Sequence, residues 1–183
     1  MSEKTVQECI RLEKYLSKYE LWADMVPKSS HYKNLRSAFS RKEWDIIKKA
    51  VYKKDGYKCS ICGVENVRLE AHEEWKYNYK KFVQKLVAIN TLCFYCHQNK
   101  HLGHAFILAD EGKLDRERLL SYWSVINNKP LESSRDYFIK VLRLWELRNN
   151  FDWIIVDNKD KEITKEVEFS NILELITNKF EES

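Results

Sequence analysis

Two short stretches, Cys59-Ser-Ile-Cys62 and Cys93-Phe-Tyr-Cys96, decide how this chain folds. In each stretch two residues separate the thiols, and that spacing lets both sulfurs bind one metal ion. Two such pairs complete a tetrahedral four-cysteine zinc site. Two disulfides or a redox pair are the alternatives, but no apolar export signal follows the first residues, which favours a reducing, cytoplasmic location. We therefore expect structural Zn2+ held by all four cysteines.

The composition is that of a protein with a sizeable core. The chain has 183 residues, of which 44% are hydrophobic and 13% aromatic, and it contains only 4 Gly and 2 Pro. So few helix breakers favour long helices joined by short links. The mean hydropathy is -0.59, and apolar runs such as Trp153-Ile-Ile-Val156 are far shorter than the roughly 18 residues of a membrane span. We expect no membrane partner, and we interpret Cys9 as an ordinary thiol.

Charge is distributed unevenly along the chain. Residues 1–104 contain 20 basic and 12 acidic side chains, whereas residues 105–183 contain 12 and 16. Such asymmetry is a recognised sign of a part that binds a polyanion. Basic side chains are also common on ordinary solvated faces, so nucleic acid, with DNA as the first candidate, is an expected partner that charge alone does not establish.

The 30 residues between Cys62 and Cys93 are more than a simple zinc ribbon contains. Alternating apolar and polar residues predict a strand over 67–72, and a polar, aromatic stretch over 73–79 predicts a loop. Val and Ile enrichment over 82–89 predicts a second strand. A helix is expected over 92–101, so the predicted order is strand, loop, strand, helix.

Three histidines in this region are candidates for a second metal site. His97 and His101 are four residues apart, which places both imidazoles on one face of the predicted helix. His72 ends the first predicted strand and can join them if the hairpin packs on that face. His104 could be a further ligand, a phosphate contact or neither. His31 has no partner of the kind a metal site needs, and we interpret it as an ordinary histidine.

The residues around these candidates resemble the zinc-containing, four-cysteine branch of the HNH endonucleases. The resemblance rests on three stretches in order: Cys59-x-x-Cys62, Leu69-Glu-Ala-His72-Glu73 and Leu92-Cys93-x-x-Cys96-His97-x-x-Lys100-His101. It covers about a quarter of the chain. It implies a ββα-metal module, in which a hairpin and a helix surround one divalent ion, and hydrolysis of phosphodiester bonds in DNA, in a phage, restriction or defence context.

The resemblance also assigns roles. His97 and His101 match the metal-binding end of the motif, and His72 with Glu73 occupies the place of the usual His-His or Asp-His pair. Either His72 or Glu73 is then the general base, and the other residue or water completes the metal shell. Imidazole ligands favour Mn2+, Ni2+ or Zn2+ over Mg2+ as the catalytic ion.

Two signature positions depart from the family pattern: His72-Glu73 replaces the usual pair, and the Asn is displaced. An Asn normally stands a few positions before the second cysteine pair, but Ala88 occupies that position here and the nearest Asn is Asn90. These two departures support an alternative function, a noncatalytic zinc-dependent module that binds nucleic acid or a partner protein.

A basic helix precedes the first cysteine pair. Ser40-Arg-Lys-Glu43 matches a capping box, and Trp44, Ile47 and Val51 follow at helical spacing. The opposite side of this helix is rich in Lys and Arg, which supply most protein contacts with phosphate. The residues expected to contact nucleic acid are Lys53, Lys54, Lys58, Lys100 and His104.

The expected fold is α+β and mainly helical. We expect an N-terminal helical segment over 1–54, the zinc-containing HNH module over 55–105 and a C-terminal helical scaffold with a short strand over 106–183. In the scaffold, helices are predicted over 114–126 and from Ser134, a strand over 153–156, and a last helix capped by Ser170. A homodimer, or a partner protein that docks on this acidic C-terminal part, is left open.

Overall fold

The computed structural model describes residues 3–31, 35–163 and 168–177. The fold is α+β, with about half of the chain helical and one small sheet of three strands. The chain forms two compact units, each made of two separate stretches: residues 1–27 with 94–151, and residues 28–93 with 152–183. The three segments expected from the sequence, over 1–54, 55–105 and 106–183, stay a prediction. In the described ranges, no helix has the length and apolar character needed to cross a bilayer.

The sheet belongs to the unit formed by residues 28–93 and 152–183. Strands β1 (Leu69–Asn78) and β2 (Val83–Cys93) form an antiparallel hairpin, and β3 (Ile154–Val156) pairs parallel with β2. The predicted loop over 73–79 is wrong, because β1 continues to Asn78. A bulge between Glu74 and Trp75 absorbs a shift in register, so the strand continues through a stretch whose side-chain alternation is irregular.

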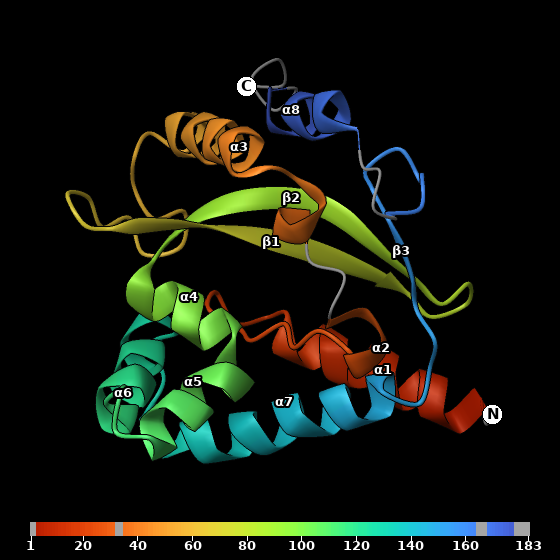
Figure 1. Cartoon of the computed structure of the whole chain (residues 1–183). Helices are drawn as coiled ribbons and strands as arrows, with labels where there is room; N and C mark the ends of the chain where they lie inside the picture. Colours follow the sequence, from red (N-terminus) through yellow and green to blue (C-terminus); the bar gives the residue numbers. More distant parts are fainter. Residues whose placement is uncertain (1–2, 32–34, 164–167, 178–183) are drawn as a thin grey trace. The chain divides into compact units, whose positions relative to one another are not determined.

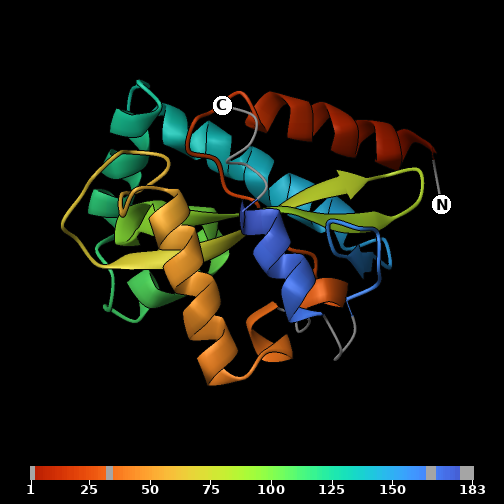
Figure 2. The ribbon, with the colours of Figure 1, turned by 90° about the horizontal axis from the view of Figure 1, so that it is seen from above.

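Two helices cover one face of this sheet. Helices α3 (Arg41–Lys54) and α8 (Phe169–Thr177) lie next to each other on the same side of β1 and β2 (Figures 1 and 2). The capping box is confirmed: the Ser40 hydroxyl accepts a hydrogen bond from the Glu43 N–H, and the Glu43 carboxylate accepts one from the Ser40 N–H at 2.8 Å. Ser170 is not a cap, because α8 begins one residue earlier.

The two faces of the hairpin have different compositions. On the face under α3 and α8, which we call the core face, Ala71 and Trp75 of β1 pack with Leu86 and Ile89 of β2 in the hydrophobic core. Because Glu73 pairs with Ile89, it belongs to this face too. We call the opposite face the polar face, since it carries His72, Glu74 and Asn90. His72 pairs with Asn90 across the hairpin, and Asn90 donates a hydrogen bond of 2.5 Å to Glu74.

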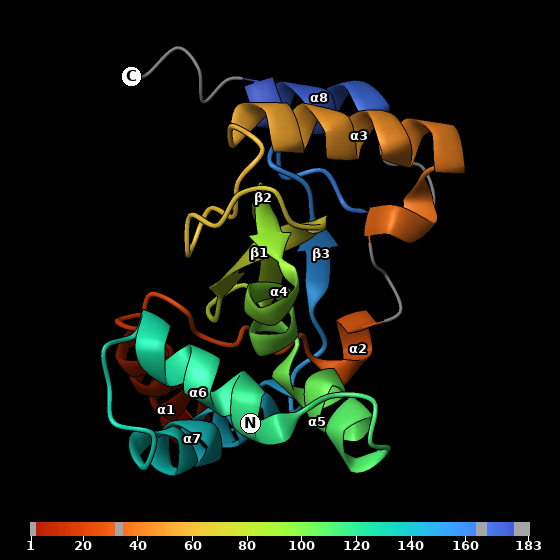
Figure 3. The same cartoon turned by 90° about the vertical axis from the view of Figure 1, so that its left-hand side faces the viewer.

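In its described part, the unit formed by residues 1–27 and 94–151 has helices as its only regular elements, joined by turns and by a nonhelical stretch over 17–27 (Figure 3). Its helices are α1 (Glu3–Leu16), α4 (Phe94–Lys100), α5 (Leu102–Asp110), α6 (Arg116–Ile126) and α7 (Ser133–Arg148). Helix α7 packs on α1, and α4 contacts α5 and α6. The helices predicted over 92–101, over 114–126 and from Ser134 are confirmed with small shifts in their ends, since β2 continues as far as Cys93.

A buried arginine of this helical unit is compensated by two carboxylates. The guanidinium of Arg148 is 1% exposed and pairs with Asp24 at 2.8 Å and with Glu13 at 3.0 Å. Cys9 of α1 is fully buried, and this burial raises the pKa of its thiol to about 11. Cys9 therefore stays protonated at neutral pH, in agreement with its interpretation as an ordinary thiol.

Two short elements complete the sheet-containing unit. Helix α2 (Lys28–His31) and the 3-10 helix η1 (Leu35–Ala38) precede α3. Leu35 is fully buried in the same hydrophobic core as Trp44, Ile47 and Val51 of α3. The core thus fixes the chain that leads into α3 as well as the helix itself.

Candidate metal centre

The first cysteine pair lies on a tight turn that leads into the hairpin. The N–H of Gly63 donates to the Cys59 carbonyl at 2.9 Å, and the N–H of Cys59 donates to the Val64 carbonyl at 3.0 Å. Gly63 has a φ of 72°, a left-handed conformation that glycine adopts without a steric penalty. The N–H of Ser60 donates to the Thr91 carbonyl at 2.8 Å, which ties this turn to the end of β2.

The second pair is positioned by continuous local structure. Cys93 is the last residue of β2, and Cys96 lies in the first turn of α4, which follows β2 without a break. The sulfurs of Cys62 and Cys93 are 3.6 Å apart. Four thiolates at a tetrahedral Zn2+, each about 2.3 Å from the ion, stand about 3.8 Å from one another, whereas a disulfide needs about 2.05 Å.

The four thiols form one group. The sulfurs of Cys59, Cys62, Cys93 and Cys96 all lie within 4.8 Å of one another, and the structure contains none of these residues in a disulfide. Three of the four side chains are buried. This donor set, with four soft sulfurs enclosed by protein, is that of a structural zinc site. The predicted cysteine cluster is thus confirmed as a group able to hold a metal ion.

The three candidate histidines form a second group. One nitrogen of each of His72, His97 and His101 lies within 4.8 Å of the others. The rings of His97 and His101 are 4.6 Å apart between centroids and nearly perpendicular, at 79°. His72 is 5% exposed. Three imidazole nitrogens are a ligand set that suits Zn2+, Ni2+ or Cu2+ better than Mg2+.

The hairpin places the two residues of the predicted catalytic pair on opposite faces. Successive side chains of a strand alternate between faces, and Glu73 shares the core face with Ala71 and Ile89. His72 lies on the polar face with its partner Asn90. Glu73 therefore points away from His72, and the carboxylates on the His72 side of the strand are those of Glu70 and Glu74.

The sequence analysis did not identify Glu74 and Asn90 as site residues. Asn90 stands three residues before Cys93, so it is displaced from the position at which the family motif has its Asn. Pairing across the hairpin nevertheless puts it opposite His72. The signal that could have found both residues was the strand period of two, once β1 was known to extend beyond Glu73.

The basic residues expected to contact nucleic acid fall into two classes. Lys54 has 9% of its side chain exposed, pairs with Asp55 at 3.3 Å and donates to the Ile89 carbonyl at 2.6 Å. Lys100 is 8% exposed, and its ammonium lies 5.3 Å from the centre of the Trp22 ring. These two side chains have structural roles that the sequence analysis missed. By contrast, Lys53, Lys58 and His104 are exposed.

Asp55 adds a further link between α3 and the metal-binding region. Its carboxylate accepts a hydrogen bond of 2.7 Å from the N–H of Thr91, two residues before Cys93. Tyr52 of α3 donates to the Leu69 carbonyl at 2.8 Å, where β1 begins. The C-terminal end of α3 is therefore bound to both strands close to the cysteines.

Comparison with known proteins gives no match: no protein-family profile, no curated protein and no solved structure matches this chain. The assignment of a function therefore depends on the chemistry of the two ligand groups.

Proposed function

We propose that this protein is a metal-dependent nuclease of the HNH type that hydrolyses phosphodiester bonds in DNA. The observation that carries the proposal is the separation of ligand chemistry into a group of four thiols and a group of three imidazoles. A four-cysteine site has no open position for a substrate. The imidazole group, made only of nitrogen ligands, leaves coordination positions for water or phosphate.

The order of elements supports the same proposal. Strands β1 and β2 form a hairpin, and α4 follows directly, which is the order of a ββα-metal module. His72 comes from the first strand, and His97 and His101 come from the helix and the residue that follows it. The three residues that the family resemblance singles out are thus contributed by the expected elements.

His97 and His101 would hold the catalytic cation. A divalent ion bound there would supply a Lewis acid that stabilises negative charge on the scissile phosphate. A neutral imidazole at His72 can accept the proton of the attacking water, because imidazole is the side chain that most often acts as a general base. Glu73 does not share this work in the proposal, since its side chain belongs to the core face.

Glu74 and Asn90 are the proposed positioning residues. Their hydrogen bond spans the two strands on the face that carries His72. Asn90 is the direct partner of His72 in the hairpin, so it can brace this part of β1 as the displaced Asn of the motif. A brace of this kind keeps a catalytic side chain in its productive orientation.

Two measurements on the purified protein test the proposal. Elemental analysis should find Zn2+ at one ion per chain under conditions in which the second group is empty. Addition of Mn2+, Ni2+ or Mg2+ should then produce nicks in supercoiled plasmid DNA. His97→Ala and His101→Ala should each abolish nicking while keeping one Zn2+ and the wild-type circular dichroism spectrum.

His72→Ala separates the two roles of that residue. If His72 is the base, the variant keeps the second ion and loses the cleavage rate, whereas loss of the ion itself identifies His72 as a ligand. His104→Ala is the control for metal binding, because His104 is exposed and lies outside the imidazole group. Nicking that survives the loss of both His97 and His101 would overturn the proposal. Tight DNA binding without cleavage with any of these metals would favour the noncatalytic module instead.

A further inference from the structure

A cavity of about 440 Å³ lies beside the N-terminal half of α3, within the sheet-containing unit. Its lining comes from η1, from the turn after η1 and from the first two turns of α3: Arg36, Phe39, Arg41, Trp44, Asp45 and Lys48. None of these residues belongs to the groups of thiols and imidazoles. The cavity is therefore a separate feature of the same unit.

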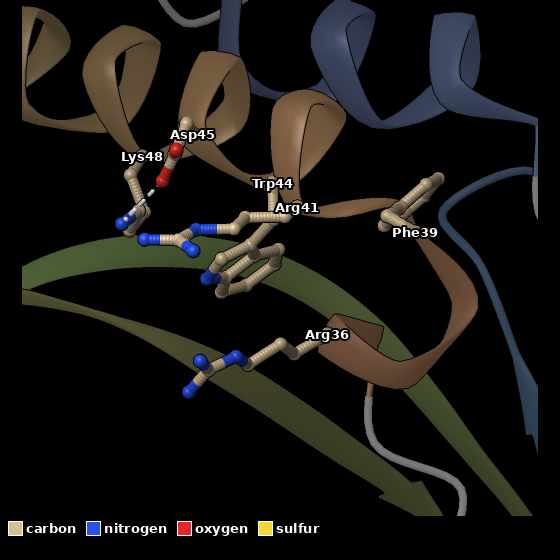
Figure 4. A pocket seen from close by; sticks show the side chains of 6 residues that line it. All are labelled: Arg36, Phe39, Arg41, Trp44, Asp45 and Lys48. Carbon is tan, nitrogen blue, oxygen red and sulfur yellow. Dashed lines mark ion pairs between the residues drawn. The ribbon is translucent and has the colours of Figure 1, made fainter.

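Three cationic side chains converge on this cavity. The guanidinium groups of Arg36 and Arg41 and the ammonium of Lys48 extend to the same side of the Trp44 indole (Figure 4). Asp45 is the one acidic residue of the lining, and it pairs with Lys48 at 2.7 Å. The lining thus has a surplus of two positive charges.

The surplus resides on the two arginines. In the described ranges, neither Arg36 nor Arg41 forms an ion pair with a carboxylate, and both residues are exposed. Arg148 in the helical unit is the opposite case, since two carboxylates compensate it. A guanidinium presents several N–H donors in a planar fork that matches phosphate oxygens. The chemistry of the cavity is therefore that of a phosphate site.

The cavity has room for more than a phosphate. Its volume lies within the range of about 300–1,000 Å³ that small-molecule sites have. Trp44, which is 8% exposed, and the half-buried Phe39 add aromatic surface to the lining. Phe39 is held by an edge contact with Phe169 of α8, with 6.0 Å between ring centroids. Cations beside a fixed aromatic surface are the combination with which proteins bind nucleotides of single strands.

The surroundings favour a strand over a free nucleotide. Lys42, Lys49 and Lys53 are exposed on the same helix, and residues 28–93 contain 15 Lys and Arg against 7 Asp and Glu. A positive surface that continues beyond a cavity can follow a polyanion backbone. In a duplex each base is paired and stacked, so an aromatic-lined cavity can receive it only after it leaves the helix.

We propose that this cavity binds one nucleotide of a single-stranded nucleic-acid segment, with its phosphate on Arg36 and Arg41 and its base against Phe39 and Trp44. The inference deepens the proposed function, because it names the form of nucleic acid that the nuclease engages. The cavity would hold the strand apart from the metal-binding groups, so it contributes to substrate preference and takes no part in the chemical step.

Fluorescence anisotropy with a labelled DNA of about twelve nucleotides, either single-stranded or paired with its complement, tests this inference. The zinc-loaded protein is used without added divalent cation, and a denaturing gel verifies that the DNA stays intact. Arg36→Gln with Arg41→Gln removes both guanidinium groups. Lys80→Gln with Lys81→Gln is the matched control, since it removes two exposed charges from the turn between β1 and β2 of the same unit and leaves the cavity lining unchanged.

The arginine double variant should bind the single strand about 10- to 100-fold more weakly than the wild type, because two charge-assisted contacts are lost. The lysine double variant should change the affinity about threefold or less. A millimolar nucleoside monophosphate should compete with the strand for the wild-type protein, with a much weaker affinity than the strand itself. Circular dichroism and thermal melting establish that both variants are folded.

Equal losses in the two double variants would overturn the inference, because general charge would then explain the binding. It also fails if the arginine variant loses duplex and single-strand affinity in equal measure, or if the free nucleotide binds as tightly as the strand. These outcomes are independent of the nuclease proposal, which depends on nicking and on His97. If the protein nicks DNA but the arginine variant binds single strands normally, only the proposal of a nucleotide-binding cavity is refuted. If the wild type binds single strands through the arginines but does not nick DNA, only the nuclease proposal is refuted.

Discussion

The two faces of the β1–β2 hairpin are built from alternating residues of the same two strands and serve different purposes. The core face carries Ala71, Trp75, Leu86 and Ile89 into the hydrophobic core beneath α3 and α8. The polar face carries His72 with its partner Asn90. Because side chains alternate along a strand, stability and candidate chemistry are one residue apart in sequence and on opposite sides of the sheet. Substitutions of neighbouring residues should therefore have effects of different kinds.

If the four thiols hold structural Zn2+, its loss should have the largest effect, because the cysteines lie at the turn before the hairpin, at the end of β2 and at the start of α4. In small modules structural Zn2+ contributes about 10–16 kcal/mol of apparent free energy. Cys62→Ala should therefore prevent stable folding of the hairpin, as measured by circular dichroism and by zinc content. Cys9→Ala is the control and should keep the zinc, since Cys9 lies in α1 outside the thiol group. A Cys62 variant with wild-type stability would show that the thiols are not a structural metal site.

Substitutions of two adjacent residues, Ile89 on the core face and Asn90 on the polar face, measure how much each face contributes to the free energy of unfolding. Ile89→Ala should lower the free energy of unfolding by about 2–5 kcal/mol, because Ile89 is 1% exposed and its truncation leaves a cavity in the core. Asn90→Ala should cost about 1 kcal/mol or less, since it removes an exposed hydrogen bond to Glu74. Urea denaturation measures both. Equal losses would mean that the polar face also carries the fold.

Substitutions of two adjacent glutamates, Glu73 on the core face and Glu74 on the polar face, measure how much each face contributes to the rate of DNA cleavage. Glu74→Gln should lower the maximal rate of plasmid nicking about 10- to 100-fold, as the loss of a positioning partner does. Glu73→Gln should change the rate by about twofold or less, because Glu73 shares the core face with Ile89. Both rates are measured at saturating DNA so that binding does not contribute. If Glu73→Gln instead lowered the nicking rate more than Glu74→Gln, Glu73 would be the general base.

The smallest expected effect concerns the start of α3, the helix that covers the core face. Ser40→Ala removes the hydroxyl that accepts the Glu43 N–H and should lower the free energy of unfolding by about 1 kcal/mol. The nicking rate at a temperature where the variant is folded should stay unchanged, because the cap lies on the core side of the hairpin. Thermal melting, with nicking measured in parallel, checks both expectations.

Local patterns in the sequence predicted the ligand groups well. The spacing of Cys59 with Cys62 and of Cys93 with Cys96 is set by turns a few residues long, and the structure brings these four sulfurs together. His97 and His101 are one helical turn apart, and their rings do lie together. The capping box at Ser40 also formed as predicted. Within each cysteine pair, within the histidine pair and at the cap, the groups are close in sequence, so their local geometry depends on little else. The meeting of the two cysteine pairs, which are separated by 30 residues, depends on the hairpin.

Features that depend on distant pairing were harder to predict. The stretch over 73–79 resembles a loop in composition, and pairing with β2 makes most of it a strand. Lys54 resembles an exposed cation at the end of a basic helix, but the Ile89 carbonyl and Asp55 hold it in place. The two discontinuous units could not be derived from consecutive changes in composition.

The amino-acid sequence by itself determined the ligand types, their spacing and the helix that carries the second cysteine pair, because turns and helices depend on residues a few positions apart. Only the tertiary structure decided which face of the hairpin each side chain occupies. That choice depends on the register between β1 and β2 and on the bulge after Glu74, and a shift by one residue would reverse it. Pairing across the hairpin therefore sets Glu73 apart from His72 and brings Asn90 opposite it.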